Sequence, residues 1–188
     1  LSVKRQRAAK KLDSLVEKEL HTLGMKKAVF KAKWRQTDLN SDGIDEIEFL
    51  ISTNVGTELK PLTKIASGGE ISRVMLAMKT VLAQTDQIPT LIFDEIDVGI
   101  GGHTANIVGK KLKELSKFCQ VICITHLPQI ACLADRHFRV DKRVRNKQTV
   151  ITAYQLTEED RVSELARMQG DKTAQAAMAY ARELLDKR

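Results

Sequence analysis

The strongest constraint on the fold is a pair of short apolar segments that each end in polar residues. Residues 90–93 (Thr-Leu-Ile-Phe) precede Asp94 and Glu95, and residues 120–125 (Gln-Val-Ile-Cys-Ile-Thr) form the second run. Such runs are typical of parallel strands buried on both faces. A helical pattern over 104–117 connects them, and this strand-helix-strand order indicates a βαβ unit. The sequence therefore predicts an α/β fold with a mainly parallel sheet flanked by helices.

The first 24 residues have a different pattern. Residues 3–23 place apolar side chains at helical spacing, and Gly24 is a favourable helix stop. The stripe is narrow, which favours one strand of a coiled coil over the alternative, a plain surface helix. We therefore assign residues 1–24 to the end of a coiled-coil arm. The stripe consists of Ala8, Ala9, Leu12, Leu15, Val16, Leu20 and Leu23.

The remaining elements are predicted from their periodicity. Phe30, Ala32 and Trp34 alternate with basic residues, and this half-buried strand is followed by a turn at 40–43 and a second strand over 47–53. These two strands are expected to pair antiparallel. Helices are expected over 70–84, 158–168 and 172–187, a short helix is expected at Pro128, and strands are expected over 137–141 and 148–154.

Charge and composition exclude several classes of protein. The net charge of +7 comes from residues 1–35, which hold 11 basic and 3 acidic side chains, so a uniformly basic nucleic-acid coat is excluded. No apolar run approaches the roughly 18–20 residues of a membrane helix, and the N-terminus lacks a signal peptide's apolar segment. Three cysteines without a C-x-x-C pair fit a reducing cytosol. A cytoplasmic location without a membrane partner is predicted.

The segment Ser67-Gly68-Gly69-Glu70 opens the predicted helix at 70–84. Ser67 and Glu70 have the spacing of a capping box, and the two glycines allow a ligand to approach the backbone closely. Free N–H groups at a helix start favour an anion such as phosphate. The alternative is a simple capped helix.

Asp94 and Glu95 follow the first apolar strand directly. Two carboxylates at the C-terminal end of a buried strand are typical of a magnesium and water site in phosphoryl-transfer enzymes. Neighbouring residues of a strand point to opposite faces, so one acid can face a metal while the other faces a water molecule. The alternative is that both acids cap the next turn.

His126 follows the second apolar strand, after Thr125. This places it at the same sheet edge as Asp94 and Glu95, where α/β proteins bind ligands. A structural or solvated histidine is one alternative. A zinc site shared with Cys123 is a weak second alternative, because no further ligand spacing supports it.

No G-x-x-x-x-G-K-[ST] phosphate loop occurs in the sequence. The order of the motifs that are present, Ala-Ser-Gly-Gly-Glu-Ile-Ser-Arg at 66–73, Leu-Ile-Phe-Asp-Glu at 91–95 and Thr125-His126, resembles the signature, Walker B and switch-histidine motifs of ABC-type ATPases. With a coiled-coil stub, the chain resembles the structural-maintenance-of-chromosomes (SMC) class, whose ATPase head is divided between the two ends of the chain. The run Asp-Val-Gly-Ile-Gly-Gly at 97–102 resembles its bacterial recombination and repair branch.

The resemblance implies that residues 25–188 are the C-terminal part of an ABC-type ATPase head, with the phosphate loop in an absent N-terminal half. It implies ATP and Mg²⁺ as cofactors. Asp94 would hold Mg²⁺ through water, Glu95 would orient or deprotonate the attacking water, and His126 would contact the γ-phosphate. The residues implied to contact ATP across a head dimer are Ser67, Gly68, Gly69 and Glu70, with Asp97 in the loop that crosses the interface.

The resemblance further implies ATP-dependent pairing of two heads, coupled to holding DNA in double-strand break repair in the bacterial nucleoid. This chain alone is expected to be inactive. The alternatives are the head of another SMC or Rad50-type protein, a transporter ATPase, which the missing loop disfavours, and a non-catalytic DNA-binding scaffold. Two groups are candidates for DNA contact, namely the Lys and Arg side chains of residues 4–35 and the cluster Arg136, Arg139, Lys142, Arg143, Arg145 and Lys147, with solvated charge as the alternative.

Overall fold

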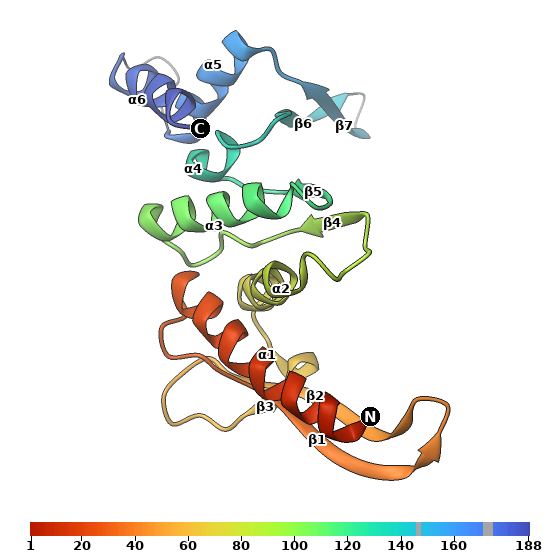
Figure 1. Ribbon diagram of the computed structural model, residues 1–188. Helices are drawn as coiled ribbons and strands as arrows, with labels where there is room; N and C mark the ends of the chain where they lie inside the picture. Colours follow the sequence, from red (N-terminus) through yellow and green to blue (C-terminus); the bar gives the residue numbers. More distant parts are fainter. Residues whose placement is uncertain (146–147, 171–174) are drawn as a thin grey trace.

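The computed structural model describes residues 1–145, 148–170 and 175–188, and its elements follow one another along a single long axis (Figure 1). At one end, α1 lies beside an antiparallel sheet, and α5 and α6 form the other end. The elements are α1 (Ser2–Thr22), β1 (Val29–Asn40), β2 (Gly43–Ser52), β3 (Lys60–Pro61), a 3-10 turn η1 (Leu62–Lys64), α2 (Gly68–Leu82), β4 (Thr90–Phe93), α3 (Gly102–Leu115), β5 (Gln120–Cys123), α4 (Pro128–Ala131), β6 (Phe138–Arg145), β7 (Gln148–Gln155), α5 (Glu158–Met168) and α6 (Gln175–Asp186).

The predicted elements are present with small shifts at their ends, apart from residues 172–174, which lie outside the described part of the chain. Val16 and Leu20 of α1 are fully buried, as is Leu23 directly after the helix, whereas Leu15 is 39% exposed. The buried side of α1 packs against β1 and α2. Gly24 ends the helix at φ +87°, a backbone conformation that residues with a Cβ rarely adopt.

The first two strands form the expected antiparallel hairpin. Phe30 pairs with Ile51 and Trp34 with Ile47, and the rings of Phe30 and Phe49 stack with centroids 5.6 Å apart. A carboxylate from α1 joins this sheet, because Asp13 accepts a hydrogen bond of 2.7 Å from the Ala32 N–H. The hairpin and α1 therefore form one unit.

Strands β4 and β5 pair in parallel, with Phe93 opposite Cys123, as the βαβ pattern predicts. The expectation of a mainly parallel sheet needs correction, because the other strand pairs of the described residues are antiparallel, as short connections between consecutive strands require. The expectation of burial on both faces also needs correction. Phe93 packs in the core, but Ile92, Ile122 and Ile124 on the opposite face are 67%, 44% and 56% exposed.

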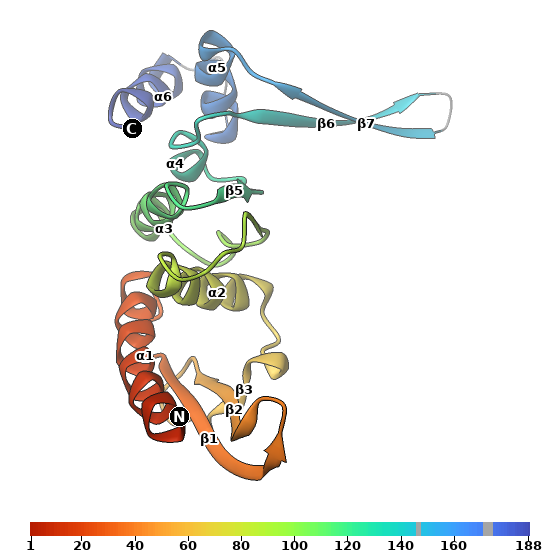
Figure 2. The ribbon, with the colours of Figure 1, turned by 45° about the vertical axis from the view of Figure 1, so that its right-hand side comes forward.

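Helix α2 lies between α1 and α3 (Figure 2). Val74, Leu76 and Ala77 are fully buried, but Met75, which the helical pattern places on the apolar side, is 36% exposed. The buried surface is wider than a single stripe because neighbouring helices cover α2 on two sides. This packing fixes the N-terminal end of α2, where the Ser67–Glu70 motif lies.

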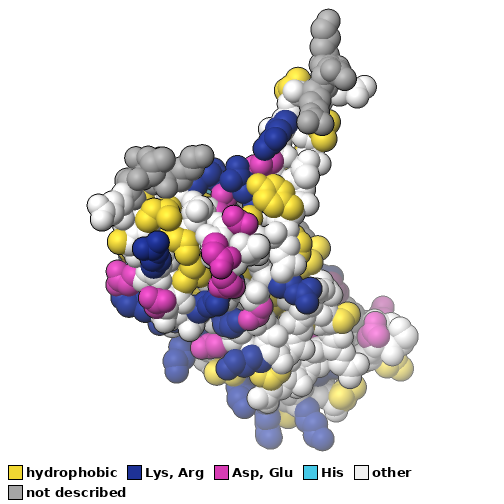
Figure 3. Space-filling model, turned by 90° about the horizontal axis from the view of Figure 1, so that it is seen from above, with side chains coloured by type: hydrophobic (Ala, Val, Ile, Leu, Met, Phe, Trp, Pro, Cys, Tyr) yellow, Lys and Arg dark blue, Asp and Glu magenta, His cyan; other side chains and the backbone are white. Residues whose placement is uncertain are grey.

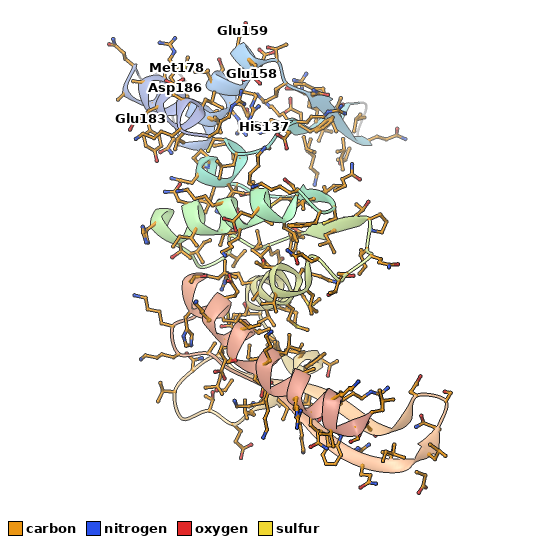
Figure 4. The ribbon with its side chains drawn as sticks, viewed as in Figure 1. His137, Glu158, Glu159, Met178, Glu183 and Asp186 are labelled. Carbon is orange, nitrogen blue, oxygen red and sulfur yellow. The ribbon has the colours of Figure 1, made fainter. Side chains whose placement is uncertain are left out.

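The C-terminal region is a second, smaller packing unit. Arg161 of α5 is 2% exposed and donates to the carbonyl oxygens of Cys132 and Ala134, which joins α5 to α4. Glu158 at the start of α5 pairs with Arg161 and with Arg188 after the end of α6, and Figure 4 shows Glu158 at α5, to the right of Asp186 of α6. The β6–β7 hairpin projects from this body (Figure 2). No helix among the described residues is long and apolar enough to cross a membrane.

Candidate functional site

The N-terminal end of α2 has the geometry that its sequence predicts. Ser67 is the N-cap, and its hydroxyl oxygen accepts a hydrogen bond of 3.3 Å from the Glu70 N–H. Gly68 and Gly69 form the first turn, where backbone N–H groups are not used inside the helix. This helix start therefore provides the backbone donors and the positive dipole end that favour an anion.

The two glycines are needed because the loop after β4 lies directly against them. A Cβ atom on Gly68 would lie 1.9 Å from Glu95 Oε2, and one on Gly69 would lie 3.0 Å from the backbone oxygens of Glu95 and Val98. A larger residue at 68 would displace the Glu95 carboxylate, and one at 69 would push against the backbone of this loop. The predicted anion-binding helix start and the predicted catalytic acid are thus brought together within one chain.

Two side chains of α2 fasten the same loop. The Ser72 hydroxyl donates to the Asp94 carbonyl oxygen at 2.7 Å. Arg73 is 7% exposed, and its Nη1 donates to the carbonyl oxygens of Ile96 at 3.2 Å and Val98 at 2.9 Å. Burial lowers the pKa of the Arg73 guanidinium, and Glu70 opposes this effect. The start of α2 and the loop 94–98 therefore form one connected unit.

Asp94 and Glu95 are both exposed at the end of β4. Asp94 Oδ1 accepts the Glu95 N–H at 2.8 Å, which orients the Asp94 carboxylate and is also what a turn-capping acid would do. Glu95 has φ +56°, in the left-handed region. Its carboxylate lies against Gly68, at the positive end of α2.

Asp97 and His126 are in direct contact. The Asp97 carboxylate is 2% exposed, and its Oδ2 lies 2.9 Å from the His126 N–H and 3.1 Å from His126 Nδ1. The Thr125 hydroxyl also donates to Oδ2. The His126 side chain is 71% exposed. The Asp97 carboxylate thus has its partners within its own chain, and the position of its loop at a dimer interface, which the resemblance implies, stays a prediction.

The residues at this edge fit Mg²⁺ and nucleotide phosphate, although no group of three or more His, Cys, Asp and Glu side chains that could enclose a metal occurs in the described residues. Mg²⁺ is usually held by one or two carboxylates together with phosphates and water. The Asp94 carboxylate is exposed and oriented, so it is suited to be such a ligand. Phosphate fits the donors at the start of α2.

The zinc alternative has no support in this geometry. Burial, followed by the negative charges of Asp97 and Asp94, raises the pKa of the Cys123 thiol to about 12. The free thiol is therefore protonated at neutral pH, and the described residues hold no group of three or more His, Cys, Asp and Glu side chains that could bind zinc.

Sequence reasoning did not identify the supporting roles of Ser72, Arg73 and Thr125. All three lie inside motifs that the sequence shows, but each bonds to a segment more than 20 residues away. Periodicity carries no signal for such contacts. The one available hint for Arg73 was its place directly before the apolar run at 74–78 of the same helix.

The sequence is 48% identical to DNA repair protein RecN of Treponema pallidum over 193 residues, 98% of this chain and 34% of that relative. It is 44% identical to DNA repair protein RecN of Vibrio cholerae over 184 residues, 96% of this chain and 33% of that relative. The chain is a homologue of the C-terminal part of RecN. It spans about a third of the length of these RecN relatives. The predicted recombination and repair branch is thus confirmed.

Solved structures show that this chain has the fold of part of an SMC head domain. The Smc head domain of Pyrococcus yayanosii, with a coiled coil and joint, matches with a TM-score of 0.58 at 20% identity, over 97% of this chain and 30% of that chain. A structure from work on ATP-driven dimerization and DNA-stimulated activation of SMC ATPases matches with a TM-score of 0.53 at 19% identity, over 91% and 99%. A scan of protein-family models found no match.

Proposed function

We propose that this RecN segment is the C-terminal lobe of an ATPase head in an SMC-like DNA repair protein. The homology to RecN and the SMC head fold support the general class. The observation that carries the proposal is the position of Gly68 directly against Glu95, because it places the proposed catalytic acid of one nucleotide beside the helix start proposed to contact a second one. Residues 25–188 would form the lobe, and residues 1–24 the root of a coiled-coil arm.

Each residue of the edge has a role in this proposal. When bound, ATP would supply the phosphoryl group, and Mg²⁺ would supply positive charge that neutralises the negative charge of the phosphates. Asp94 would hold the ion through water, and Glu95 would orient or deprotonate a water molecule. His126 would contact the γ-phosphate with its exposed ring. Such sites act by positioning and charge stabilisation, which suits a rigid edge.

The start of α2 would serve a second nucleotide. Ser67, Gly68, Gly69 and Glu70 would contact ATP held by the opposite head of a homodimer, which would couple ATP binding to head pairing. The first nucleotide needs a phosphate loop, and this would come from the N-terminal part of the same protein. The exposed face of β4 and β5 is a suitable place for that part to pack, because Ile92, Ile122 and Ile124 form an apolar surface.

DNA is proposed as a partner on the basis of the RecN homology, and the surface charge is weaker support. Arg5, Lys31 and Arg35 form ion pairs with nearby carboxylates, and Arg139 pairs with Asp141 and Glu164. Figure 3 shows acidic and basic side chains interspersed over the end formed by α5 and α6. In the hairpin cluster, Lys142 and Arg143 are exposed, whereas Lys147 and the Arg145 side chain lie outside what the structure describes.

The test is Glu95→Gln in the complete protein. The amide keeps the size of the side chain but cannot accept a proton from water, so we expect ATP turnover to fall by about 100-fold or more while ATP-bound head dimers accumulate. Turnover and dimer content are measured by phosphate release and by size-exclusion chromatography. Glu48→Gln, the same change on β2, is the matched control and should have no effect. Undiminished turnover in Glu95→Gln would contradict the catalytic role and favour the scaffold alternative.

A further inference from the structure

Asp97 is the buried carboxylate of the edge, in contrast to the exposed Asp94 and Glu95 that precede it. A buried carboxylate is unfavourable unless donors satisfy it. Two donors bond to one of its oxygens, namely the Thr125 hydroxyl and the His126 backbone N–H, and His126 Nδ1 lies 3.1 Å from the same oxygen. All three belong to the segment that follows β5. Asp97 therefore connects the loop after β4 to the end of β5.

The contact with Nδ1 determines the state of the His126 ring. A lone pair on Nδ1 would face the negative charge of the carboxylate at 3.1 Å, so the tautomer that carries the proton on Nδ1 is favoured. In the neutral ring, Nε2 is then the unprotonated nitrogen, and a proton gained there can be donated outward. Because the side chain is 71% exposed, its own packing does little to fix the ring. Asp97 supplies that constraint, as hydrogen-bond partners of histidine generally do.

We propose that Asp97 is a positioning residue that holds His126 as the Nδ1–H tautomer with Nε2 directed away from the chain, toward the reacting phosphate. The proposal rests on the proposed ATPase function for its catalytic part. The orientation and tautomer of the ring follow from Asp97 and the segment after β5 alone, so they can be tested without ATP.

The first test is a nitrogen NMR spectrum of His126 in the complete protein, selectively labelled at histidine, with His126→Gln to assign the signal. At a pH where the ring is neutral, the expected result is Nδ1 with the shift of a protonated nitrogen and Nε2 with that of an unprotonated one. In Asp97→Ala, this preference should be lost. A predominant Nε2–H tautomer in the unmodified protein would overturn the proposal, even if ATP turnover is normal.

The second test is a double-mutant cycle on ATP turnover. Asp97→Asn keeps an oxygen that can accept the Thr125 and His126 N–H donors, so the loop stays tied while the charge is lost. We expect kcat to fall about tenfold with KM nearly unchanged. In the His126→Ala background, the same change should alter kcat less than about twofold, because Asp97 acts through the ring.

Asp38→Asn, the same change on the exposed end of β1, is the matched control and should leave kcat unchanged in both backgrounds. An equal loss in both backgrounds would show that Asp97 only ties the loop, and would overturn the positioning role. Failure of the proposed function has a different signature, because Glu95→Gln would then retain full turnover while the tautomer of His126 stays as predicted.

Discussion

At the scale of single residues, the backbone of Glu95 is the most unusual feature of the site. It is the non-glycine residue with positive φ in the described part of the chain, at +56°. The left-handed region costs a residue with a Cβ roughly 1–2 kcal/mol. Such strain persists where the surrounding structure fixes it, and it is concentrated at functional sites. Here the bonds from Ser72 and Arg73 fix the loop on both sides of Glu95.

This strain predicts that activity and stability oppose one another at position 95. Glu95→Gly removes the Cβ and should raise the free energy of unfolding by up to about 1 kcal/mol, while ATP turnover is lost. Glu95→Gln keeps the Cβ and should leave stability unchanged. Urea denaturation of both variants measures the difference. A Glu95→Gly variant less stable than Glu95→Gln would show that position 95 is not strained.

The sequence predicted part of the site at this scale. Asp94, Glu95 and His126 were identified because acids and a histidine directly follow apolar strands. The burial of Asp97 and its contact with His126 could not be predicted, because they depend on how two loops meet 29 residues apart. The same holds for Arg73, whose partners lie 23 and 25 residues away.

At the scale of elements, the close approach of α3 and α4 depends on one glycine. A Cβ on Gly109 would lie 2.7 Å from Leu133 Cδ1 and 3.2 Å from the Gln129 carbonyl oxygen. Helix α4 is in turn joined to α5 by Arg161, which donates to the carbonyl oxygens of Cys132 and Ala134 directly after α4. The placement of the C-terminal unit therefore depends on this helix contact.

Gly109→Ala is expected to lower the free energy of unfolding by about 1–3 kcal/mol, because the added methyl group forces α4 away from α3. The intrinsic helix preference of alanine acts in the opposite direction by up to about 1 kcal/mol. Gly101→Ala, at the start of the same helix with nothing within 4 Å of the added Cβ, is the matched control. Chemical denaturation compares the two. Equal stability would contradict the close contact.

Element types were more predictable than their surroundings. The periods of 3.6 and 2 identified α1, α2 and the β1–β2 hairpin, because a single buried face produces them. The apolar runs of β4 and β5 predicted parallel pairing correctly. They did not show that only one face of this strand pair packs against other described residues. Met75 illustrates the same limit, since periodicity does not reveal how many neighbours surround a helix.

At the scale of the whole molecule, the exposed side chains of Ile92, Ile122 and Ile124 form the surface on which the N-terminal part of the protein is proposed to pack. If the N-terminal part of the protein covers them, a charge placed there should be harmless in the segment and costly in the complete protein. Ile122→Asp is expected to change the stability of the segment by less than about 0.5 kcal/mol. In the complete protein, the buried charge should lower the melting temperature by several degrees.

Differential scanning calorimetry of both forms measures this difference. Ile151→Asp, on the exposed hairpin strand β7, is the matched control and should change the melting temperature little in both the segment and the complete protein. A mild effect of Ile122→Asp in the complete protein would contradict the proposed packing surface.

The packing of α1 on α2 has a mechanical consequence. Helix α1 contacts α2, and α2 is bonded through Ser72 and Arg73 to the loop that carries Glu95. No flexible linker interrupts this path. A pull on α1 would therefore be transmitted through packed side chains and hydrogen bonds to Glu95, the proposed catalytic acid.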